Sequence, residues 1–157
     1  MSIHLSQKIV AAVDVASPPE LVSADDGGLR LSLNLIASGP VGLAFDRLEF
    51  QAPGPDRTAA NLRAWADKLA SQVTYLMEPL VVLEIDAVAG EVELRSQSPT
   101  PRGQLKSYYE VRLTKIGTMT ISRIVYDSTT RRRSVTPCQV TREVLERLTD
   151  DIVACAP

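Results

Sequence analysis

The chain has 157 residues, enough for one domain that buries a sizeable core. Hydrophobic residues make up 45% of it and charged residues 23%, as in an ordinary globular protein, and the net charge of −2 argues against nucleic acid as a partner. Aromatic residues make up only 4%, so the core must be aliphatic.

Neither a membrane span nor a secretory signal is expected. No apolar run approaches the roughly 20 residues that a helix needs to cross a bilayer. The N-terminal apolar patch is short and is interrupted by Asp14, which makes it a poor match to a secretory signal. We therefore expect a cytoplasmic protein with no membrane contact.

Charge is unevenly distributed along the chain. Residues 95–147 hold eleven basic and four acidic residues, a net charge of +7. The remainder holds six basic and fifteen acidic residues, a net charge of −9. Such asymmetry favours either self-association or an acidic partner, and by itself it does not decide between them.

The first part of the chain predicts a helix followed by a loop. Apolar side chains recur at helical spacing over residues 5–16. Two prolines and two glycines mark residues 17–28 as a loop. We expect a single domain, residues 1–157, with the helix and loop of residues 1–28 at its periphery.

Two strands are predicted next. Leucines alternate with polar residues over residues 29–36, the period of a half-buried strand. The following strand, residues 41–50, also alternates, but its apolar positions change parity at Asp46 and Arg47. One extra residue in a strand produces such a shift, so we expect a β-bulge there.

The clearest helix covers about residues 57–78. Apolar side chains, Trp65 among them, recur there at steps of three and four and form one stripe. Beyond this helix the period-two alternation returns. It predicts hairpins that turn near Gly90 and Gly117, and residues 129–135 can return beside the second hairpin.

A C-terminal helix is predicted over about residues 137–154. Thr136 would be its N-cap and Pro137 its first residue, and Gln139, three residues after Thr136, would complete a capping box. The element order is then α-ββ-α-ββββ(β)-α. This order indicates an α+β fold in which an antiparallel sheet of about six or seven strands carries the long and C-terminal helices on one face.

Cys138 would lie in the first turn of that helix. A helix N-terminus and nearby arginines lower the pKa of a thiol, so Cys138 is a candidate reactive thiol. The alternative is simple apolar packing, which is the commoner fate of a cysteine and needs no base. Cys155 would lie a helix length away, too far for a disulfide within one chain, and free thiols fit a reducing compartment.

Arg131, Arg132 and Arg133 form the second candidate site. Arginines beside the amides of a helix N-terminus can hold a phosphate or a carboxylate, so we consider an anion or partner contact. The alternatives are a solvated hairpin and, less in keeping with the acidic composition, contact with nucleic acid.

The chain lacks the motifs of common catalytic sites. With two cysteines and one histidine it has no zinc-ligand pattern, and it has no phosphate-binding glycine loop, so we expect neither a metal nor a cofactor.

Three functional hypotheses follow. The first is a non-enzymatic binding module that forms a homo-oligomer through an open sheet face and binds a protein or an acidic partner. The second is a small apolar-ligand pocket between the sheet and the long helix. The third is an enzyme that uses Cys138 as its reactive thiol.

Overall fold

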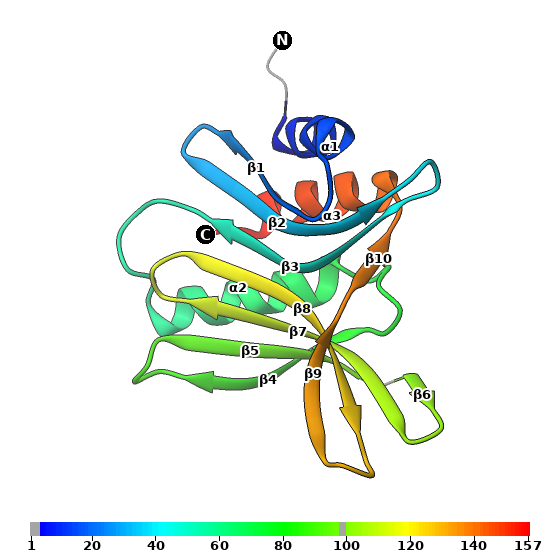
Figure 1. Ribbon diagram of the computed structural model, residues 1–157. Coiled ribbons are helices and arrows are strands. Elements are labelled where there is room, and N and C mark those ends of the chain that lie inside the picture. The colour runs from blue at the N-terminus through cyan, green and yellow to red at the C-terminus, as the bar shows by residue number, and fades with distance from the viewer. Residues whose placement is uncertain (1–3, 98–99) are drawn as a thin grey trace.

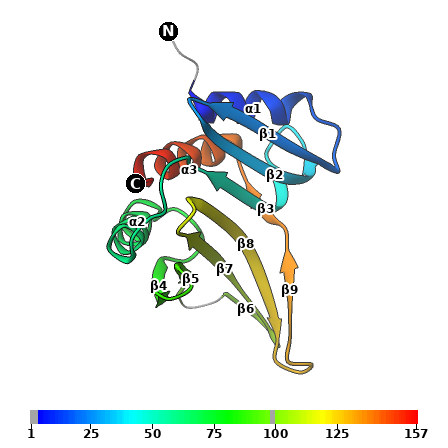
Figure 2. The same ribbon diagram turned by 90° about the vertical axis from the view of Figure 1, so that its left-hand side faces the viewer.

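The computed structural model describes residues 4–97 and 100–157, so residues 1–3 of the predicted N-terminal segment lie outside it. Three helices line one side of a large antiparallel sheet (Figures 1 and 2), which confirms the α+β class. The helices are α1 (Leu5–Val15), α2 (Ala59–Gln72) and α3 (Arg142–Cys155). The strands are β1 (Glu20–Asp26), β2 (Leu29–Ser38), β3 (Leu43–Gln51), β4 (Leu80–Asp86), β5 (Glu91–Ser96), β6 (Thr100–Arg102), β7 (Leu105–Thr114), β8 (Thr118–Asp127), β9 (Arg132–Thr136) and β10 (Cys138–Val140).

The sheet follows the path β1-β2-β3-β8-β7-β5-β4, and three further strands are attached to it. β9 pairs with β8, β10 with β3 and β6 with β7, and every pairing is antiparallel. The predicted hairpins are confirmed, because β4 and β5 turn at Gly90, β7 and β8 turn at Gly117, and β9 returns beside β8. Strands β3 and β8 meet although α2 and four strands separate them in sequence.

The β-bulge predicted in β3 is present. Leu33 of β2 faces Leu48 of β3, whereas Leu35 faces Phe45. Two residues of β2 therefore span three of β3, and the extra residue lies at Asp46 and Arg47. The bulge keeps Phe45 and Leu48 both buried in the core despite their change of parity.

The prediction of a loop over residues 17–28 is wrong, because residues 20–26 form β1. This strand pairs with β2 along its whole length. Val22 and Ala24 alternate into the core, but two apolar residues are a weak strand signal between prolines and acidic residues. The glycines mark only the tight turn, where Gly27 and Gly28 both have positive φ.

The long helix is confirmed but shorter than predicted. It begins at Ala59 behind the N-cap Thr58, whose hydroxyl oxygen accepts a hydrogen bond from the Asn61 amide, and it ends at Gln72. Buried apolar residues continue into the coil after α2, where Tyr75 donates a hydrogen bond to Asp151 of α3. That contact with α3 is non-local, so helical periodicity could not reveal it.

The C-terminal helix is also confirmed, and it begins at Arg142, later than predicted. Thr141 is its N-cap and accepts a hydrogen bond from the Val144 amide at 3.1 Å. The predicted cap, Thr136, is the last residue of β9, and residues 138–140 form β10. Pairing with β3 requires extended backbone there, so the capping box read from the sequence does not form.

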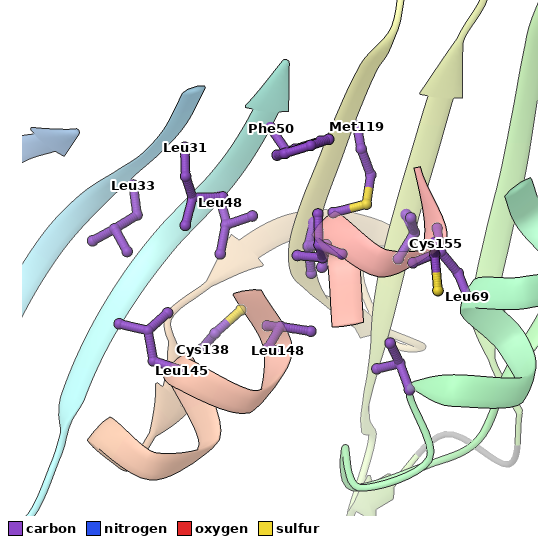
Figure 3. Close-up of a cluster of buried hydrophobic side chains, with 14 of the residues drawn as sticks. Leu31, Leu33, Leu48, Phe50, Leu69, Met119, Cys138, Leu145, Leu148 and Cys155 are labelled. Atoms are coloured by element: carbon purple, nitrogen blue, oxygen red, sulfur yellow. The ribbon is translucent and has the colours of Figure 1, made fainter. Parts of the chain in front are cut away.

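The core lies between the sheet and the helix layer (Figure 3). Trp65 of α2 is 1% exposed, and its neighbours on the apolar stripe are buried with it. Helix α1 buries Leu5, Ile9 and Val13 against β1 and α3, so it contributes to the same core. Within the described residues, no helix has both the length and the apolar content that crossing a membrane requires.

Candidate interaction surface

One side of the sheet faces away from the helices (Figure 2) and is here called the open face. It carries mainly polar side chains. Residues alternate between the two sides of a strand, so Val111 and Leu113 of β7 point into the core while Glu110 and Arg112 point outward. The strand register then places outward residues of neighbouring strands in rows across the sheet.

Two adjacent rows cross the centre of the open face. In each row, four residues from β3, β8, β7 and β5 lie directly opposite one another in the strand pairing. The Arg47 row contains Arg47, Ser122, Glu110 and Arg95. The Glu49 row contains Glu49, Thr120, Arg112 and Glu93. At each charged position the two rows carry opposite signs, and at the position on β8 both carry a small hydroxyl residue.

Ion pairs connect these rows within the chain. Arg112 lies 3.0 Å from Glu110 and 2.9 Å from Glu93, and its hydrogen bond to Glu110 raises the pKa of the Arg112 guanidinium. Arg95 lies 3.4 Å from Glu93, and Arg47 lies 3.7 Å from Glu49. Alternating charges that neutralise each other allow this many ionic groups to occupy one face without net repulsion.

The open face is hollowed next to these rows. A depression of about 440 Å³ is lined by residues of both rows and by Ile124 and Val135. A second depression of about 400 Å³ lies towards β1 and β2. Asn34 and Arg47 line both, so the two depressions are adjacent.

The structure does not bring the three candidate arginines together as one anion site. Arg131 occupies the turn between β8 and β9 with φ 59°, and Arg132 begins β9. Arg133 instead turns onto the open face, where its guanidinium lies 2.6 Å from Glu110 and 5.8 Å from the ring centre of Tyr108. The prediction placed the N-terminal amides of the last helix directly after these arginines. Helix α3 begins only at Arg142, so this part of the prediction is wrong.

Two further basic residues, Arg102 and Lys106, lie beside this turn. Lys106 of β7 faces Tyr126, which in turn faces Arg133, and Arg102 precedes the turn from β6 to β7. The Ser128 amide and hydroxyl both donate to the carbonyl of Gln104, at 2.9 and 3.0 Å, which joins the two turns. The sequence separates these cations by more than twenty residues, so only the strand pairing brings them together.

Cys138 lies in β10 and is fully buried among core residues, near Leu145 and Leu148 of α3 (Figure 3). Burial raises the pKa of its thiol to about 12, opposite to the lowering that a helix N-terminus would produce. Both cysteines are free, as expected. A buried, protonated thiol gives no support to the reactive-thiol hypothesis.

A buried ion pair lies at the other side of β8, and nothing in the sequence indicated it. Arg123 and Glu78 are 7% and 5% exposed, and their side chains approach to 3.3 Å. The Ser96 hydroxyl donates to Glu78 at 2.8 Å, and the Arg123 guanidinium stacks 4.6 Å from the ring centre of Tyr109. This network ties β5, β7 and β8 to the coil before β4.

The acidic residues of β4 and β5 share the open face. Glu84 faces Glu93 and Asp86 faces Glu91, so like charges lie opposite each other in the strand pairing. Among the described residues, no group of three or more histidine, cysteine, aspartate or glutamate side chains is arranged to hold a metal ion.

The space between α2 and the sheet is filled by side chains. Leu62, Trp65 and Leu69 are each at most 2% exposed and belong to one continuous hydrophobic cluster. The depressions named above lie on the open face instead. The hypothesis of an apolar ligand beneath the long helix gains no support from this packing.

The sequence matches no protein-family model, and no curated protein sequence matches it.

Proposed function

We propose that this chain is a non-enzymatic interaction module that forms a homodimer through the open face of its sheet. The observation that carries the proposal is the opposite charge pattern of the Arg47 row and the Glu49 row. Two surfaces of opposite pattern attract, and here both belong to the same molecule, side by side. A second copy of the chain is therefore a partner with matching charges.

We place a twofold axis between the two rows, parallel to the rows and perpendicular to the strands. The Arg47 row of one copy would then lie on the Glu49 row of the second copy, and the Glu49 row on its Arg47 row. Arg47 would then face the second copy's Glu49, and Glu110 would face its Arg112. Ser122 and Thr120 would meet at the centre, where small side chains allow the sheets to approach closely. Twofold symmetry repeats each contact, as in most homodimers.

The size of the face sets the strength that we expect. Seven strands at about 4.8 Å spacing and about six residues at about 3.3 Å give a face of roughly 30 by 20 Å. Two such faces bury about 1,200 Å², which is at the lower end of specific interfaces. Exposed ion pairs contribute about 0.2–1 kcal/mol each, so we expect a moderate affinity that falls with added salt.

A charge swap tests the proposal. The variants Arg47→Glu and Glu49→Arg each place like charges opposite one another twice across the axis, and each should dissociate the dimer. The double variant Arg47→Glu/Glu49→Arg restores opposite charges at both contacts, so it should dimerise like the wild type. Sedimentation velocity at micromolar concentration, in about 50 mM and 500 mM salt, measures all four proteins.

The control is a matched ion pair on the helix side. Arg63 and Asp67 form an exposed pair on α2 at 3.6 Å, and Arg63→Glu reverses one charge there without touching the open face. It should leave the dimer unchanged. A wild type that stays monomeric at every concentration, or a double variant that fails to recover, would contradict the proposed dimer.

A cytoplasmic location is part of the same proposal. It is supported by the two free cysteines, which a reducing compartment maintains.

A further inference from the structure

The turn between β8 and β9 projects beyond the rest of the sheet, at the bottom of Figure 1. Basic residues are concentrated there. Four exposed cations, here called the basic tip, lie on it and on the adjoining β6–β7 hairpin: Arg102, Lys106, Arg131 and Arg132. Within residues 4–97 and 100–157, none of them lies within ion-pair distance of a carboxylate.

The one carboxylate in the turn is occupied by the backbone. Asp127 accepts hydrogen bonds from the amides of Thr129 and Thr130 at 2.9 and 3.4 Å, and its own carbonyl accepts from the amide of Arg131. Asp127 therefore shapes the turn and leaves the basic tip with a strong net positive charge.

An opposite charge excess lies on the hairpin of β4 and β5. Its three exposed acids, here called the acidic hairpin, are Glu84, Asp86 and Glu91. Asp86 and Glu91 face each other, and like charges directly opposite destabilise a strand pair. In the part of the chain that the structure describes, these three acids lack a cation within ion-pair distance, and Asp86 accepts hydrogen bonds from the amides of Val88 and Ala89 at 3.1 and 3.0 Å. Lys115, whose side-chain carbons lie against Gly90, and Arg112, which lines the same depression as the three acids, supply positive charge nearby.

The two ends cannot neutralise each other within one chain. In Figure 1 the turn between β4 and β5 lies at the left of the sheet, whereas the projecting β8–β9 turn lies towards the right at the bottom. A twofold axis perpendicular to the strands would reverse left and right, and so would carry the tip of one copy towards the other copy's β4–β5 turn. The contact between the Arg47 row and the Glu49 row of the two copies does not include the acidic hairpin. Its acids lie outside the two rows or on β4, beyond the β5 residues at which the rows end.

We propose that the basic tip of each copy binds the acidic hairpin of the second copy, so that two reciprocal charge clamps flank the dimer. This inference rests on the proposed homodimer and adds the contact that orients it. Stacked bases are a less suitable occupant, because of the two tyrosines near the tip, Tyr108 is 8% exposed and covered by Arg95 and Arg133, and Tyr126 is only partly exposed.

The reciprocal arrangement gives a distinctive result in mixtures. The tip variant Arg131→Glu/Arg132→Glu leaves two cations and two carboxylates among the four residues of the basic tip, so its positive charge is cancelled. The hairpin variant Glu84→Lys/Glu91→Lys changes the charge of the acidic hairpin from −3 to +1, so both clamps of its own dimer become repulsive. Each alone should weaken dimerisation on the order of tenfold or more, since each removes the attraction at both clamps and the hairpin variant also adds a repulsion. In an equimolar mixture, the unchanged tip of the hairpin variant meets the unchanged hairpin of the tip variant, so each heterodimer keeps one wild-type clamp and should form more tightly than either variant dimerises alone.

To measure this recovery, the fluorescently labelled tip variant is titrated with the unlabelled hairpin variant. Analytical ultracentrifugation at two salt concentrations then measures the affinity of the mixture. The matched controls are Arg63→Glu/Lys68→Glu and Asp56→Lys/Asp67→Lys, which change the charge by the same amount on exposed residues of α2 and the loop before it. They should dimerise like the wild type, alone and mixed. Circular dichroism checks that every variant is folded.

The outcomes separate the two proposals. If the wild type and the row double variant dimerise but the tip and hairpin variants keep wild-type affinity, the clamp is refuted and the dimer stands. If the mixture fails to recover, the clamp is refuted as well, because the two ends do not meet. A monomeric wild type would overturn both proposals.

Discussion

Replacement of Arg123 by methionine should destabilise the fold more than the loss of any other ion pair among the described residues. Arg123 and Glu78 are the one oppositely charged pair within the described residues in which both side chains are less than 10% exposed. Methionine keeps much of the apolar contact with Tyr109 but removes the positive charge. The Glu78 carboxylate then stays buried with the Ser96 hydroxyl as a donor but without the guanidinium.

The magnitude follows from burial and geometry. Removing one partner of a buried ion pair costs about 3–5 kcal/mol, because the remaining charge has lost its compensation. The distances of 3.3 and 3.4 Å between Arg123 and Glu78 are long for charge-assisted hydrogen bonds, which places the expected loss near the lower limit, at about 3 kcal/mol. With a urea slope of about 2 kcal/mol/M, the unfolding midpoint should fall by about 1.5 M.

Urea unfolding at pH 7 and at one fixed protein concentration measures this loss. The double variant Arg123→Met/Glu78→Gln should recover at least about 1 kcal/mol relative to Arg123→Met, because it leaves no uncompensated charge and keeps an acceptor for Ser96. The exposed pair on α2 provides the comparison, and Arg63→Met should cost less than about 1 kcal/mol. A loss below about 1 kcal/mol for Arg123→Met, or a double variant less stable than the single one, would refute this reasoning.

Three other predictions test local features of the fold. Gly117→Ala should lower the free energy of unfolding by at least about 2 kcal/mol, because φ is +91° and the new Cβ would clash with a backbone oxygen. Gly27→Ala, at φ +56° with open space around it, should lower it by only about 1 kcal/mol, and thermal or urea unfolding measures both. Thr141→Ala should cost about 1 kcal/mol by removing the N-cap of α3, and Thr136→Ala should cost less; the reverse order in the same assay would contradict the observed helix start. The pKa of the Cys138 thiol is raised to about 12, so in a variant with Cys155 replaced by alanine it should react with a thiol reagent at pH 8 about three orders of magnitude more slowly than a model thiol. A rate near that of the model thiol would show that Cys138 is accessible and ionised.

The sequence alone determined the features that depend on neighbouring residues. Alternating leucines gave β2, and the apolar stripe around Trp65 gave α2, because strand and helix periods are fixed by local backbone geometry. The parity change at Asp46 and Arg47 located the β-bulge for the same reason. The class of fold followed, since consecutive hairpins produce an antiparallel sheet.

Local signals were misleading where a distant strand decided the conformation. The pattern at Thr136 and Pro137 fits a helix start, but pairing of residues 138–140 with β3 holds this segment extended. Cys138 is consequently a core side chain and not a helix N-terminal thiol. Residues 20–26 show the same effect, because β2 supplies the hydrogen bonds that make a weakly apolar segment a strand.

The charge pattern of the open face depends on both levels. Opposite charges two residues apart, such as Arg47 with Glu49 and Glu110 with Arg112, are visible in the sequence and indicate outward positions on a strand. Only the strand order and register place these pairs side by side across β3, β8, β7 and β5, and so create two rows of opposite pattern. Strand alternation is a property of each segment, whereas the register between segments more than sixty residues apart is set by how the whole core packs.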